Sequence, residues 1–106
     1  MNLEVLLAVL EMPAKEQLAK CLTEIVPALV EHFEAKGGPT PEQIAKSKEL
    51  VEMLTAMPPS VLLAQGRENT KVILALASCV AALSFREEGL EIYGVRFKTP
   101  APKESS

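Results

Sequence analysis

The chain has 106 residues, of which 48% are hydrophobic and 24% are charged, and its net charge is −3 with a pI of about 5.2. This length holds one domain with a single modest core, and the composition is typical of a globular protein. The charge is too small and too negative for the phosphate contacts of a nucleic-acid-binding protein, so nucleic acid is not an expected partner.

Every acidic residue in the chain is a glutamate, and there is no aspartate. Glutamate keeps its rotamer freedom in helices, whereas aspartate prefers caps and turns, so this bias favours a mainly α fold. Cys21 and Cys79 fall within apolar helical patterns, and we expect two buried reduced thiols rather than a disulfide. The N-terminal residues lack the basic region of a signal peptide and reach Glu11 early, which predicts a cytoplasmic protein.

The first third of the chain predicts two helices that are interrupted by prolines. Residues 3–11 carry apolar side chains at helical spacing, and Pro13 either ends this helix or opens the next one. The second helix spans residues 14–36. We expect a kink at Pro27, because a proline removes one backbone hydrogen bond and crowds the preceding turn, and no full break, because Val26 would be a poor N-cap for a new helix. Its apolar stripe consists of Leu18, Leu22, Ile25, Leu29 and Phe33.

The clearest local signal is the sequence GGPTPEQ at residues 37–43. Gly37 is expected to adopt the left-handed conformation that closes a helix. Thr40 is the expected N-cap of the next helix, and Gln43 stands where its side chain completes a capping box. This helix, over residues 41–57, places four apolar side chains inward: Ile44, Val51, Leu54 and Met57.

After Pro58 and Pro59 the pattern predicts a short turn over residues 61–65 that Gly66 closes, and then a loop. Residues 72–85 follow without a single charge. A membrane-spanning helix needs about twenty apolar residues, so these fourteen are too few, and a helix that is apolar on every side must be surrounded by protein. We therefore predict a central core helix over about residues 70–86, capped by Asn69 or Thr70.

Beyond Gly89 the period changes from helical to alternating. Tyr93 and Gly94 are interpreted as the two-residue loop of a β-hairpin, whose pairs would be Ile92–Val95, Glu91–Arg96 and Leu90–Phe97. A glycine bulge within one longer strand is the alternative. The tail at residues 99–106 is expected to be disordered or extended.

Both arrangements of the C-terminal segment gather four apolar side chains on one face: Leu90, Ile92, Val95 and Phe97. The helices at residues 3–11, 14–36 and 41–57 are just enough to cover the central helix, and a lone hairpin is marginally stable in water. We therefore predict that this face is an interface with a second copy of the chain, which makes the protein a homodimer.

No set of side chains predicts catalysis. His32 is the only histidine and has no spaced partner for a metal site, so we interpret it as a helix residue that complements the helix dipole. The cysteines form no CxxC motif, and the acidic cluster at Glu87, Glu88 and Glu91 is typical of a solvated turn. The sequence therefore predicts no enzyme activity, no cofactor and no metal.

Two further patterns offer weaker alternatives. The helix–GGPT–helix segment resembles a helix-turn-helix in outline only, and Glu42, Glu49 and Glu52 on its second helix would repel phosphates. The methionines at positions 12, 53 and 57 are interpreted as core residues rather than as an adaptable binding face.

The sequence thus predicts a small, mainly α bundle of four to five helices with a C-terminal β-hairpin, organised as one domain over residues 1–98. Its predicted function is that of a non-enzymatic interaction, regulatory or adapter protein that binds a protein partner and itself. The alternatives are a small-molecule-binding helical domain, with a cavity walled by the central helix, and a weak nucleic-acid-binding regulator.

Overall fold

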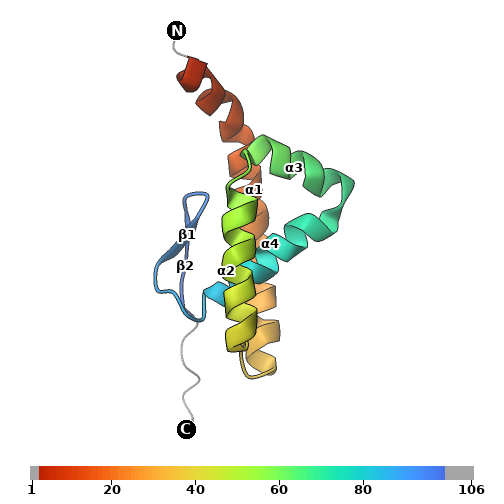
Figure 1. Cartoon of the computed structure of the whole chain (residues 1–106), viewed down its shortest axis with the longest axis vertical. Coiled ribbons are helices and arrows are strands. Elements are labelled where there is room, and N and C mark those ends of the chain that lie inside the picture. The colour runs from red at the N-terminus through yellow and green to blue at the C-terminus, as the bar shows by residue number, and fades with distance from the viewer. Residues whose placement is uncertain (1–2, 100–106) are drawn as a thin grey trace.

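A computed structural model describes residues 3–99, with side chains described for Leu3 and for residues 13–99. The helices are α1 (Leu3–Ala35), α2 (Pro41–Thr55), α3 (Pro59–Glu68) and α4 (Thr70–Leu83), and the strands are β1 (Leu90–Ile92) and β2 (Val95–Phe97). The predicted mainly α bundle with a C-terminal hairpin is confirmed (Figure 1). The predicted tail beyond Thr99 lies outside the described residues.

The long helix α1 continues through both of its prolines, so the prediction of separate helices over residues 3–11 and 14–36 is wrong. A proline inside a helix removes one hydrogen bond and crowds the preceding turn. Here the turns after Pro13 bury Ala14 and Leu18 against the rest of the protein. This burial requires the helix to continue beyond Pro13. Tertiary packing therefore outweighs the local tendency of a proline to end a helix.

The connection between α1 and α2 is built from two hydrogen-bonded caps. Gly37 and Gly38 both have positive φ angles, and the Gly38 amide donates to the Phe33 carbonyl at 2.8 Å in the Schellman arrangement. The Gln43 amide donates to Thr40 Oγ1 at 3.1 Å, and the Thr40 amide donates to Gln43 Oε1 at 2.8 Å. The predicted glycine closure and capping box are both confirmed.

Helix α3 is longer than the short turn that we predicted. Gly66 lies inside the helix, and the residues expected to form a loop, Arg67 and Glu68, are helical. Only Asn69 separates α3 from α4, and its side chain accepts a hydrogen bond from the Lys71 amide at 3.1 Å. The glycine serves close packing instead of a turn, because a Cβ atom there would meet the side chain of Ile73 and come within 2.6 Å of its Cδ1 atom.

Helix α4 is the centre of the fold, with α1 and α2 packed against it. From Leu76 to Ser84 it is enclosed, apart from a half-buried Ser78. The prediction that it is surrounded along its whole length is wrong, because Leu74 is 48% exposed and Ala75 is also exposed. The bundle therefore encloses the C-terminal part of α4 and leaves its N-terminal part partly open to solvent. No helix over residues 3–99 is both long enough and apolar enough to cross a membrane.

The strands form the predicted antiparallel hairpin in the predicted register, with Leu90 opposite Phe97 and Ile92 opposite Val95. Tyr93 and Gly94 both adopt positive φ angles, of 51° and 80°, which suit a two-residue turn between twisted strands. The alternative of a bulged single strand is therefore wrong.

Candidate functional site

The four predicted interface residues lie together on the inner face of the hairpin. Ile92 and Phe97 are buried in the chain's own core, and Leu90 and Val95 pack against that core. Our premise that the helices leave this face without cover is therefore wrong, because all four side chains join or contact the core cluster that the helices form. Whether a second copy also contacts the hairpin is not tested by the structure and stays a prediction.

A different apolar surface is open to solvent where α1, α3 and α4 meet. It surrounds a hollow of about 390 Å³, which we call the apolar cup. Its lining is Cys21 and Ile25 from α1, Leu63, Gly66 and Arg67 from α3, and Thr70, Ile73 and Leu74 from α4. Most of these side chains are aliphatic, so the cup suits an apolar guest.

The one-residue corner at Asn69 explains why the cup exists. It turns the chain so sharply that the end of α3 and the start of α4 face each other across Gly66 and Ile73. Both helix ends also face α1, where the Arg67 guanidinium donates to the Gln17 side-chain oxygen at 3.3 Å. The three helices meet there without filling the space between them, which leaves Leu74 half-exposed.

Among the described residues that line the cup, Arg67 alone is charged. Within the described part of the chain, the only ion pair is Lys46 with Glu42 at 3.7 Å, so Arg67 forms no ion pair there. An apolar hollow with one uncompensated cation at its edge suits a guest that is apolar and carries a negative charge.

A second hollow, of about 570 Å³, lies between the C-terminal half of α1 and β2. Its apolar lining includes Val26, Val30 and Phe97. Charged residues of both signs surround it, namely Glu31, Glu34, Arg96 and Lys98. Because neither sign dominates, this hollow does not define the chemistry of a ligand.

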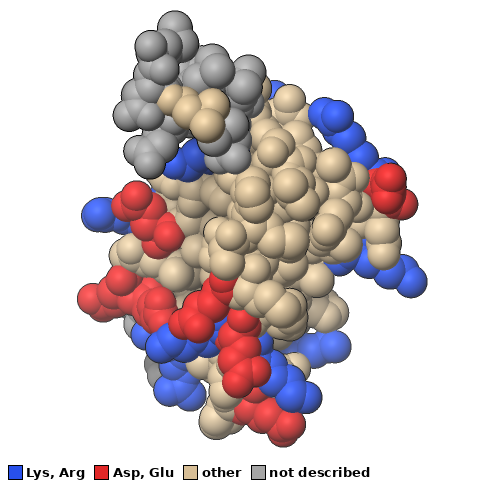
Figure 2. All heavy atoms as spheres, turned by 45° about the horizontal axis from the view of Figure 1, so that its top comes forward, with Lys and Arg blue, Asp and Glu red and all other residues tan. Residues whose placement is uncertain are grey.

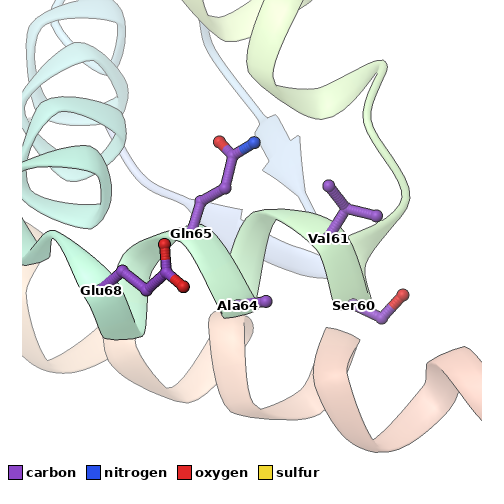
Figure 3. A pocket seen from close by; sticks show the side chains of 5 residues that line it. All are labelled: Ser60, Val61, Ala64, Gln65 and Glu68. Atoms are coloured by element: carbon purple, nitrogen blue, oxygen red, sulfur yellow. The ribbon is translucent and has the colours of Figure 1, made fainter.

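A third hollow, of about 350 Å³, follows the outer face of α3 (Figure 3). It is lined by Ser60, Val61, Ala64, Gln65 and Glu68, which all belong to this one helix. Among the described side chains, none from another element lines this hollow, so none of them would hold a ligand from the opposite side. We do not regard it as a site.

Uncharged surface is nevertheless extensive at the end of the molecule where α3 lies. Figure 2, which brings that end forward, shows a broad area without charged side chains, and the charges gather below it and at its edges. Met53 is 59% exposed and Val61 is 42% exposed, within a stretch from residue 53 to residue 66 that carries no charge. The interpretation of Met53 as a core residue is therefore wrong.

The two cysteine thiols differ in their surroundings. Both cysteines are free, with Cys79 buried and Cys21 half-buried in the cup. Burial raises the pKa of the Cys79 thiol, and its hydrogen bond with Ser47 partly offsets this effect. A raised pKa makes a thiol a poorer nucleophile at neutral pH, which fits a structural role.

The remaining candidate residues lie at the surface. His32 is exposed in the last turn of α1, where we placed it. Glu88 and Glu91 are exposed around the start of the hairpin. Among the described side chains, those of Leu3 and residues 13–99, no three histidine, cysteine or glutamate side chains lie close enough together to hold a metal ion.

No family model, no curated protein and no solved structure matches this chain. The cup therefore has to be interpreted from its own geometry. Sequence reasoning missed it because its members come from three separate helices. The only local signal was Leu74, which lies in an apolar run that we assigned entirely to the core.

Proposed function

We propose that this chain is a non-enzymatic protein–protein interaction protein, whose apolar cup binds an apolar helical segment of a protein partner. The observation that carries the proposal is the exposure of Leu74 beside Leu63 and Ile73, in a hollow that three helices frame. An amphipathic helix commonly buries its apolar face in such a groove between helices.

The balance of free energy favours a guest at this position. Burying a leucine side chain fully contributes roughly 1.5–3 kcal/mol, and Leu74 loses about half of that while it is exposed. An apolar guest would recover this contribution and would also cover Ile25 and Leu63, both half-buried. Adapter or regulatory roles follow from such binding. A cytoplasmic setting, which keeps thiols reduced, suits the free Cys21 and Cys79.

A selection experiment tests this proposal. Random amphipathic helical peptides would be displayed and selected on the full chain, with Leu74→Glu as the counter-selection. We expect selected peptides to bind the wild type and to bind Leu74→Glu at least about tenfold more weakly, because the new carboxylate would be desolvated in the cup. Equal binding to both proteins would contradict the proposal.

A small apolar ligand is the second candidate function, and the volume of the cup favours it. About 390 Å³ lies within the range of known ligand pockets, which is roughly 300–1,000 Å³. Arg67 would then bind an anionic head group. Titration with a medium-chain fatty acid, followed by the amide signals of Leu63 and Leu74, distinguishes this function, since saturable shifts that Arg67→Gln abolishes would support it.

A further inference from the structure

We infer that the guest of the cup is the N-terminal segment of α1, residues 3–12, from a second copy of the chain, so that two copies exchange these segments in an antiparallel homodimer. This inference rests on the proposed function, because it names the partner of the same cup. It replaces the hairpin with α1 as the main dimer contact.

The N-terminal segment has the composition of a helix that needs cover. Eight of the ten residues in LEVLLAVLEM are apolar, and the other two are Glu4 and Glu11. The segment is helical and continues α1 past the rest of the bundle, as the red end of the ribbon in Figure 1 shows. Leu3 at its start is 66% exposed. So apolar a helix end, projecting from a single chain, is a typical interaction element.

Charge complementarity selects this segment as the guest. It carries two glutamates and no basic residue, while Arg67 is the only charged residue in the described lining of the cup. The exposed Lys20 and Glu24, next to Cys21 and Ile25 on α1, carry opposite charges, so Arg67 sets the sign of the charge at the cup. An apolar, acidic helix therefore matches an apolar hollow with a basic edge.

The geometry of one continuous helix makes the exchange reciprocal. The segment centres near residue 7, and Cys21 and Ile25 centre near residue 23 of the same α1, which places them about 24 Å apart at 1.5 Å per residue. Two antiparallel α1 helices with a twofold axis near Lys15 would place each segment on the other copy's cup. In that arrangement position 10, which at about 100° per residue lies on the same side of the helix as Cys21, is opposite the partner's Cys21, and each interface contains the same contacts twice.

A disulfide-trapping experiment tests this register with a native cysteine. We expect Leu10→Cys to form a disulfide-linked dimer with Cys21 of the second copy during mild oxidation at micromolar concentration. The matched control is Leu10→Cys with Cys21→Ser, which we expect to stay unlinked, because the two copies of position 10 would be about 17 Å apart. Linkage in this control would indicate a parallel dimer and would overturn the inference.

Light scattering on the full chain supplies the second measurement. The wild type should have the mass of a dimer at tens of micromolar, and Leu6→Glu in the segment and Leu74→Glu in the cup should each weaken the dimer by about tenfold or more. A monomeric wild type without trapped dimer refutes this inference alone, since the peptide selection still decides whether the cup binds helices. If selected peptides bind Leu74→Glu as tightly as the wild type while the dimer is still trapped, that result would refute only the proposed function, the binding of a partner's helix in the cup.

Discussion

At the scale of single residues, Gly66 shows how one missing side chain shapes the surface. The helix has no conformational need for glycine at this position, since its φ angle is not positive. Its value lies in the contact with Ile73, which a Cβ atom would obstruct. Because Ile73 and Gly66 both line the cup, the same contact also fixes how closely α3 and α4 approach each other.

Gly66→Ala should lower the free energy of unfolding by about 1 kcal/mol. Overpacking costs about 1–3 kcal/mol, which exceeds the gain of roughly 1 kcal/mol from replacing glycine inside a helix. Urea unfolding measures the difference. The control is Ile73→Ala, a background in which the same glycine substitution should become stabilising. If Gly66→Ala changes the free energy of unfolding equally in the wild type and in Ile73→Ala, the two residues do not interact.

Cys79 predicts a decline of stability at alkaline pH. Burial raises the pKa of its thiol in the folded protein, so the unfolded chain releases the proton first. The contribution of this thiol to stability is complete below its unfolded pKa, about 8.5, and is lost as the pH rises above that value. Urea midpoints measured up to about pH 9.5, below the ordinary pKa of tyrosine, should fall for the wild type and fall less for Cys79→Ala. If the urea midpoints of the two proteins fall equally with pH, the decline does not come from Cys79.

At the scale of elements, agreement between sequence and structure follows the range of the interactions involved. The capping box at Thr40 and the hairpin turn at Tyr93 and Gly94 depend on neighbours within three or four residues, so their patterns could be predicted in detail. Pro13 and Gly66 are also local signals, but the forces that overrule them come from other helices. A proline rule cannot include the burial of Leu18, and a glycine rule cannot include Ile73.

Thr40→Ala should cost about 1 kcal/mol, because the Gln43 amide loses its hydrogen-bond acceptor at the start of α2. Thermal unfolding followed by circular dichroism measures the loss. The companion variant Gln43→Ala removes the return bond to the Thr40 amide, which lies at the exposed surface, and should cost less. An unchanged melting temperature for Thr40→Ala would mean that the cap does not stabilise α2.

At the scale of the whole molecule, the core and the cup meet on one helix. Leu76 is fully buried, and Leu74, two residues earlier, is 48% exposed. The sequence predicted that α4 is central, because an uncharged helix of this length must be enclosed. It could not predict where the enclosure ends, since that depends on how α1, α2 and α3 are arranged around α4. The cup is the result of that arrangement.

The pair Leu76→Asp and Leu74→Asp tests this boundary. Leu76→Asp should prevent folding, because it leaves an unpaired charge in the core. Leu74→Asp should keep a cooperative thermal transition, since its carboxylate reaches water in the single chain. Circular dichroism of both proteins gives the comparison. A folded Leu76→Asp protein would contradict the central position of this helix.

The length of α1 also has a hydrodynamic consequence. The molecule measures 59 × 25 × 22 Å and has a radius of gyration of 15.0 Å. A compact chain of this size is expected to have a radius of gyration of roughly 13 Å. An elongated particle tumbles anisotropically and elutes early from a sizing column, where even a single copy would resemble a larger globule. Its rotational diffusion, measured by NMR relaxation, should therefore report directly whether α1 stands free of the bundle or lies along a second copy.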